Sequence, residues 1–187
     1  MIDKKLPPER LLWLDLELTG IDVETDIILE VAALVSDFNF VNLAEYQAAV
    51  SQNQAEVREL MNANAWWQNF PQTRQQLLDE VKNGKPLITI EDELIRLIDE
   101  QFKGKPAVLA GNSIHNDRSF IKKYLPRLEA KLHYRMLDVS SFKVLMQAKY
   151  GVTIDKPEIH RAKSDIQASI EELKYYLKWF KDGSTDS

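Results

Sequence analysis

The chain has 187 residues, of which 44% are hydrophobic and 28% charged, a length and balance that fit one globular domain. It contains no cysteine, which excludes disulfides, thiol catalysis and zinc–thiolate sites. No apolar run approaches the ~20 residues of a membrane span, and Met1–Arg10 lacks a signal-peptide pattern, so we expect a cytoplasmic protein without membrane contact.

The net charge of −5 is unusual for a protein that binds nucleic acid, because phosphates favour basic surfaces. The charge is unevenly distributed. Arg118–Lys163 contains 11 Lys or Arg against 4 Asp or Glu, which leaves +7 there and −12 in the remainder. Either an ordinary solvated surface or a phosphate-facing side would explain this segment.

Three strands are expected at the start of the chain. Arg10–Glu17 is a nearly continuous apolar run that ends in two acids, which is typical of a buried central strand. A polar turn separates it from a strand over Ile27–Ser36, and a third strand is expected within Phe38–Val50. Their short connections predict an antiparallel meander.

Apolar residues at three- and four-residue spacing then predict helices over Gln72–Val81 and Glu91–Phe102. Strands and helices alternate after that: we expect strands over Pro106–Gly111 and Tyr134–Val139, and helices over Asp117–Tyr124, Ser140–Tyr150 and Ala162–Lys181. This order predicts an α/β fold with a mixed five-stranded sheet flanked by helices. It fits a ribonuclease-H-like sheet, but other α/β arrangements share it. The domain is expected to span residues 1–187, with flexible ends at 1–9 and 182–187.

Asp15 and Glu17 are the first candidate site residues. Residues two apart on a strand share a face, so these carboxylates are expected ~7 Å apart. Two acids on a buried strand repel each other and resist desolvation, and a divalent cation relieves both problems. Oxygen ligands of this kind suit Mg²⁺ or Mn²⁺. The alternative is a strand end that reaches solvent.

A second cluster is His160 and Asp165, at and just before the start of the last helix. A neutral imidazole can take a proton from an attacking water. The alternatives are capping or exposure for His160 and a dipole-favoured acid for Asp165. Asp117 follows a strand and opens a helix, which places it at the carboxyl edge of the sheet unless it merely caps that helix. Nearby His115 is a second base, a substrate contact or a surface residue.

The order of these residues resembles the DEDDh family of 3′→5′ exonucleases, which is named for four acids and a histidine. Asp15, Glu17, Asp117, His160 and Asp165 match those positions. WLDLELTGID, GNSIHNDRSF, HYRMLDVSSFK and HRAKSDIQASIEELKYY resemble oligoribonuclease motifs, and the similarity runs almost from residue 11 to 181. The resemblance implies a ribonuclease-H-like fold, a homodimer, and two divalent cations, Mg²⁺ or Mn²⁺. It also implies hydrolysis of di- to pentaribonucleotides to nucleoside 5′-monophosphates.

The resemblance also implies individual roles. Asp15 would bridge the two cations, with the other three acids completing their sites and His160 acting as the base. Ile21 would be an apolar wedge between bases, and Trp67 a stacking ring. Ser113, Arg135 and Ser140 would cap the terminal phosphate, and Tyr134 would come from the neighbouring subunit. Core packing is the alternative for the wedge and the ring.

One region departs from the family pattern. Residues 68–77, QNFPQTRQQL, depart from a family stretch that contains His and Ser-Gly-Leu. The resemblance therefore does not indicate which residues of this region contact the substrate. Glu30 fits the family pattern, either near the site or as a structural residue. The competing functions are a different DEDDh exonuclease that acts on longer RNA or DNA ends, and a catalytically silent nucleic-acid-binding protein.

Overall fold

The computed structural model describes residues 8–154 and 160–182, without the side chains of residues 180–182. Its strands are β1 (Arg10–Leu18), β2 (Ile28–Asp37), β3 (Asn42–Ala49), β4 (Ala107–Gly111) and β5 (Leu132–Asp138). They form one sheet in the order β3-β2-β1-β4-β5. The first three strands are antiparallel to one another, whereas β4 is parallel to β1 and β5 to β4. The predicted meander and mixed sheet are therefore confirmed, while the predicted flexible ends fall mostly outside the described residues.

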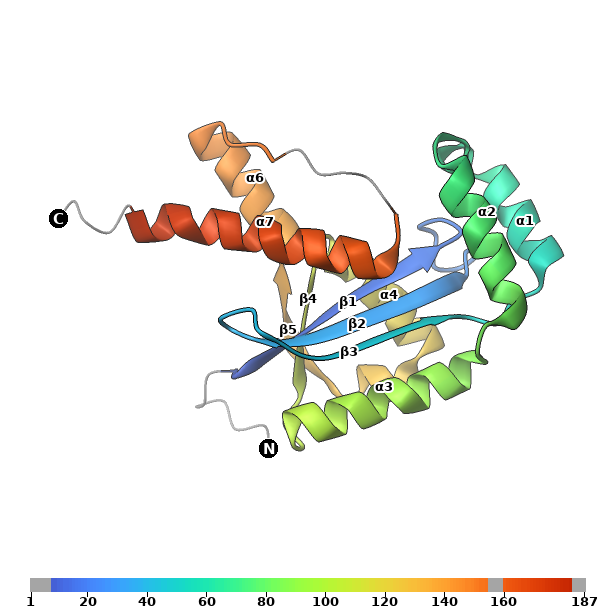
Figure 1. The fold of residues 1–187 in the computed structure, drawn as a ribbon, viewed down its shortest axis with the longest axis horizontal. Coiled ribbons are helices and arrows are strands. Elements are labelled where there is room, and N and C mark those ends of the chain that lie inside the picture. Colours follow the sequence, from blue (N-terminus) through green and yellow to red (C-terminus); the bar gives the residue numbers. More distant parts are fainter. Residues whose placement is uncertain (1–7, 155–159, 183–187) are drawn as a thin grey trace.

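Helices cover both faces of this sheet. They are α1 (Gln54–Ala63), η1 (Ala65–Asn69), α2 (Pro71–Glu80), η2 (Val81–Asn83), α3 (Leu87–Phe102), α4 (Ile114–Tyr124), α5 (Pro126–Glu129), α6 (Val139–Tyr150) and α7 (Ala162–Asp182). Figure 1 shows α6 and α7 on one side of the sheet, α3 on the other, and α1 and α2 beyond one end of the strands. No helix in the described ranges is both long and apolar enough to span a bilayer.

Strand β1 has two chemically different faces because its side chains alternate. Leu12, Leu14 and Leu16 belong to the apolar core that includes α3, α4 and α5. Leu11 and Trp13 belong to the core under α6 and α7. The two acids continue this second face towards the carboxyl end of β1. Glu17 lies opposite Glu30 in the β1–β2 register, which shifts between residues 17 and 18.

A third apolar cluster holds α1, η1 and α2 against the end of β2. Trp67 and Met61 lie at its centre together with Leu29, and all three side chains are at most 1% exposed. This small core places the 3₁₀ helix η1 beside the start of α7, so that residues from two distant parts of the sequence meet there.

Among the element boundaries that differ from the sequence-based prediction, those of α4 and β3 have a local cause. Helix α4 begins at Ile114 rather than Asp117, because Ser113 takes a left-handed conformation with φ 48° and starts the helix earlier. Strand β3 begins only at Asn42, because the Asp37 carboxylate accepts the backbone N–H groups of Asn39 and Val41 and closes a turn. Polar residues occupy both boundaries, so hydrophobic periodicity does not mark them.

The basic segment Arg118–Lys163 is largely neutralised within the fold. Among the residues of this segment that the structure describes, six cations pair with carboxylates, namely Arg118, Lys123, Arg127, Lys131, Arg161 and Lys163. A solvated, ion-paired surface therefore accounts for most of the segment better than a continuous phosphate-binding face.

Candidate active site

Three of the predicted acids meet on the α7 face of the sheet. Asp15 and Glu17 come from β1, and Asp165 comes from the first turn of α7. One carboxylate oxygen of each lies within 4.8 Å of the other two. Glu17 is only 6% exposed, which rules out the alternative of a strand end open to solvent for that residue. Three converging hard oxygens suit a Mg²⁺ or Mn²⁺ ion.

Asp117 approaches the same strand from α4. Its side chain is 8% exposed, and its Oδ1 accepts the backbone N–H of Leu16 at 3.0 Å. It is not the N-cap of α4, since Ser113 occupies that position. Gly111 at the end of β4 allows the approach: a Cβ there would lie 3.0 Å from the Leu14 carbonyl oxygen and 2.9 Å from Ile114 Cδ1.

The electrostatics of these acids favour a bound cation. Burial, followed by repulsion from Asp117 and Glu17, raises the pKa of Asp15 well above its usual value. Burial, with repulsion from Asp165 and Glu30, raises the pKa of Glu17 to about 8. Burial also raises the pKa of Asp117 to about 7, against the hydrogen bond from Leu16. Among the described residues, Glu17 Oε1 is buried without a hydrogen-bond partner. The donor set and this unsatisfied oxygen both fit a divalent cation.

His160 precedes α7 and is held against aromatic rings of the α1–α2 region. Its backbone is left-handed, with φ 50°. The imidazole centroid lies 4.0 Å from the Phe70 ring and 4.6 Å from the Trp66 ring, both in edge-on geometry. Phe70 belongs to the stretch that departs from the family pattern, and no motif or spacing predicts this contact. The role of His160 as a base stays a prediction.

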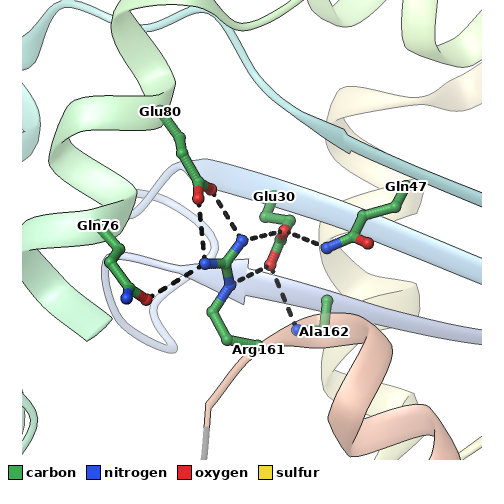
Figure 2. A network of polar contacts seen from close by, with 6 residues as sticks. All are labelled: Glu30, Gln47, Gln76, Glu80, Arg161 and Ala162. Atoms are coloured by element: carbon green, nitrogen blue, oxygen red, sulfur yellow. Dashed lines mark hydrogen bonds and ion pairs between the residues drawn. The ribbon is translucent and has the colours of Figure 1, made fainter. Parts of the chain in front are cut away.

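Glu30 is buried beside the acids and is fully engaged. It is 1% exposed and accepts hydrogen bonds from Gln47, Arg161 and the backbone N–H of Ala162. Figure 2 shows how the Arg161 guanidinium joins this carboxylate to Glu80 of α2. The open question about Glu30 is thus answered in part: it is a structural anchor next to the site.

Ile21 stands on a closed loop after β1. Its side chain is 84% exposed, so core packing does not explain it. The loop is tied at its base, where Thr19 N–H donates to the Ile27 carbonyl at 3.1 Å and the Thr19 hydroxyl donates to Asp26 at 2.7 Å. Tyr124 of α4 donates to the Asp26 carbonyl at 2.9 Å. An exposed apolar side chain on such a fixed loop is suited to insert between bases.

The two tryptophans of η1 point to different environments. Trp67 is 1% exposed, and its indole N–H donates to the Thr19 carbonyl at 2.9 Å. Core packing, the alternative for this residue, therefore accounts for its contacts, and in this conformation its ring offers no face to a base. Trp66 is 40% exposed and lies beside His160.

The predicted phosphate-cap residues are only partly brought together. The Ser113 and Ser140 hydroxyls are 3.1 Å apart, and Asp138 accepts the backbone N–H of both serines. Arg135 and Tyr134 are exposed on the edge strand β5, with the guanidinium 5.3 Å from the tyrosine ring centroid. In the described part of the chain, the two hydroxyls bond each other, and the Ser140 hydroxyl also donates to Asn112 Oδ1, whereas neither bonds Arg135. His115 Nδ1 lies 3.4 Å from Asp138, and its side chain is mostly exposed.

Comparison with known proteins decides the family. A family model described as exonuclease matches residues 12–173. An oligoribonuclease of Corynebacterium glutamicum is 41% identical over 178 residues, which cover 92% of this chain and 80% of that protein. The chain belongs to the oligoribonuclease branch of the exonuclease family. Oligoribonucleases of Francisella tularensis and Neisseria meningitidis are 36% and 35% identical, and each alignment covers at least 90% of both proteins. The predicted resemblance to oligoribonucleases is thereby confirmed.

Solved structures confirm the fold. Escherichia coli exonuclease I in complex with a 5cy-dT13 oligonucleotide matches with a TM-score of 0.64 at 14% identity, over 94% of this chain. The chain spans 41% of that longer protein. Other exonuclease I structures match similarly, for example with a TM-score of 0.61. The predicted ribonuclease-H-like arrangement of a mixed sheet between helices is correct.

Proposed function

We propose that this protein is a metal-dependent 3′→5′ exoribonuclease that hydrolyses di- to pentaribonucleotides to nucleoside 5′-monophosphates. The observation that carries the proposal is the convergence of Asp15, Glu17 and Asp165 at the end of β1, with Asp117 beside them, in a chain of the oligoribonuclease family. Asp15, Glu17 and Asp117, whose pKa values are raised by burial and by neighbouring carboxylates, have little structural purpose without a cation.

Two divalent cations, Mg²⁺ or Mn²⁺, fit these acids. Asp15 is central to the acid cluster, since Asp117, Glu17 and Asp165 all raise its pKa after burial does, and it is the natural bridging ligand. Glu17 and Asp165 would complete one ion site, and Asp117 would contribute to the other. When bound, such ions stabilise the attacking and leaving oxygens of an in-line phosphoryl displacement.

His160 would act as the general base. It lies five residues before Asp165, which is in the first turn of α7. The aromatic contacts with Trp66 and Phe70 restrict the orientation of its ring. A neutral imidazole so oriented can take the proton of the attacking water, a role worth about 10²–10⁴ in rate.

Preference for short RNA would come from the surrounding residues. Ile21 would separate the bases, and Ser113, Ser140 and Arg135 would close on the terminal phosphate, which Arg can grip with two hydrogen bonds. Tyr134 is 58% exposed on an edge strand, so a second copy of the chain can place it in its partner's site. We therefore also propose a homodimer acting in the cytoplasm, with Trp67 stacking only if the η1 region rearranges.

A length series tests this function. Hydrolysis rates are measured from a dinucleotide to an icosanucleotide, in RNA and in DNA, with Mg²⁺, Mn²⁺ or chelator. Metal-dependent release of mononucleotides, fastest for the shortest RNA and absent in Asp15→Ala, is expected. A faster rate on the longest chains would instead favour a different exonuclease of the same fold.

Arg135→Ala isolates the cap within that series. Loss of one bidentate phosphate contact is expected to lower dinucleotide turnover by about 10–100-fold while changing the longest substrates little. Equal losses at every length would contradict a terminal cap.

A further inference from the structure

Arg161 occupies a special place in the chain. It follows His160 directly, and its carbonyl oxygen accepts the backbone N–H of Asp165 at 3.0 Å, which is the first hydrogen bond of α7. The position of its backbone therefore sets the position of both residues. One is the proposed base, and the other is a proposed metal ligand.

The guanidinium of Arg161 grips carboxylates from two other elements (Figure 2). Its Nη2 lies 2.8 Å from Glu30 Oε1 on β2 and 2.8 Å from Glu80 Oε2 on α2. Nε donates to Glu30 at 3.2 Å, and Nη1 donates to Glu80 at 3.1 Å. Each carboxylate thus receives two N–H groups from one rigid plane. The start of α7 is fastened to the sheet and to α2 at the same time.

Glu30 makes this connection rigid. Its carboxylate is almost fully buried and also accepts the Gln47 amide at 2.7 Å and the Ala162 backbone N–H at 3.3 Å. The bond to Ala162 caps the amino end of α7 from a strand that is distant in sequence. Glu30 lies opposite Glu17 in the strand register. The capped end of α7 is therefore held in a fixed position relative to β1, the strand that carries Asp15 and Glu17.

We propose that Arg161 is a positioning residue for the hydrolytic reaction. Through Glu30 and Glu80 it holds His160 and Asp165 in register with the acids of β1. Stability alone is a weak reason for this arrangement, because a buried ion pair contributes little over an apolar pair of similar size. The inference rests on the proposed function, since it concerns the same site.

Three single variants test the role by steady-state kinetics on a dinucleotide with saturating Mn²⁺. Arg161→Met is expected to lower kcat by about 10–100-fold with KM changed less than about threefold, because supporting residues act on placement rather than on substrate binding. Arg161→Lys keeps the charge but loses the planar guanidinium that donates two N–H groups to each carboxylate. Its kcat is therefore expected to lie between those of Arg161→Met and wild type. Lys163→Met is the control: this cation pairs with Glu45 at the surface of the same helix, and kcat should stay within about twofold.

A double variant separates positioning from simple charge neutralisation. Arg161→Met alone leaves the Glu30 carboxylate buried without its cation, which lowers the melting temperature. Glu30→Gln combined with Arg161→Met removes that penalty, so the melting temperature should return towards wild type while kcat stays low. Recovery of kcat in the double variant, or wild-type kcat in Arg161→Met, would overturn the inference. Failure of the wild type to release mononucleotides would instead sink the proposed function.

Discussion

Four carboxylates at the end of β1 sit in different local environments. Asp117 has a backbone donor, Leu16 N–H at 3.0 Å, whereas Glu17 has one buried oxygen without a partner among the described residues. Asp15 is repelled by Asp117 on α4 and by Asp165 on α7, as well as by Glu17 on its own strand. Because Asp117, Glu17 and Asp165 all raise the pKa of Asp15, these residues act as one unit, and the response to removing one of them depends on whether a cation is present.

Asp15→Asn separates the two situations. Without metal, the variant is expected to melt at the same temperature as wild type or higher, because one charge of a repelling group is lost. Turnover is expected to fall roughly a hundredfold or more, since ligation by this carboxylate supplies several kcal/mol. Melting curves in chelator and Mn²⁺ titrations of the apo-protein measure both effects. A large loss of apo stability would show that Asp15 is structural.

His160→Ala should affect a different step. We expect kcat to fall by about 10²–10⁴ while the affinity for Mn²⁺ changes less than about threefold, because the imidazole moves a proton and does not hold the ion. Calorimetric titration with Mn²⁺ and dinucleotide kinetics are the two measurements. A parallel loss of metal affinity would make His160 a ligand instead.

Individual site residues differ in how far the sequence revealed them. Strand alternation indicated Asp15 and Glu17, and the order of motifs shared with a known family indicated Asp117 and Asp165. The ring contacts of His160 and the grip of Arg161 on Glu30 join segments that are far apart in sequence, so no spacing predicts them. A buried Glu inside the apolar run ILEVA was the available signal, since such an acid needs a partner.

At the scale of elements, the two adjacent tryptophans of η1 have different surroundings: Trp67 is buried in the core, whereas Trp66 is partly exposed beside His160. Trp67→Ala should destabilise the protein by ~3–5 kcal/mol, as expected for a large buried ring. Trp66→Ala should leave stability within ~1 kcal/mol and act mainly on dinucleotide kinetics, because the ring is 40% exposed and touches His160. Denaturant melts paired with kinetics decide between these effects. Equal destabilisation by both variants would contradict the division.

Most elements were predictable and their ends less so. Hydrophobic periodicity predicts the buried strands β1, β2 and β4 from their apolar runs, and helix α7 from apolar residues at three- and four-residue spacing. The start of α4 was missed because Ser113 adopts a left-handed conformation that tertiary contacts with Asp138 and Ser140 stabilise.

For the whole molecule, the raised pKa values predict an unusual pH dependence of apo stability. The folded protein keeps protons on Glu17 up to about pH 8 and on Asp117 up to about pH 7, whereas the unfolded chain releases them near the ordinary values of 4.5 and 3.8. The folded state therefore binds more protons between these limits. Its stability contribution is complete below the unfolded pKa values and is lost as pH rises through the folded ones.

We accordingly expect the melting temperature in chelator to fall from about pH 5 to about pH 8. Mn²⁺ should raise it more at the upper end, because ion binding must displace these protons. Melting curves with and without Mn²⁺ across this range are the measurement, and Asp15→Asn should flatten the chelator curve. A melting temperature that climbs with pH in chelator would show that the acids are already ionised in the folded protein.

The two-faced character of β1 has a consequence for how this protein can change over time. Leu11 and Trp13 keep step with Asp15 and Glu17 through the simple alternation of the strand. Deleting or inserting one residue among them would rotate either the carboxylates or the tryptophan into the wrong layer. Strand β1 can tolerate single substitutions, but it cannot tolerate a change in its length. Homologues that retain hydrolysis should therefore show gaps in the loops and none in this strand.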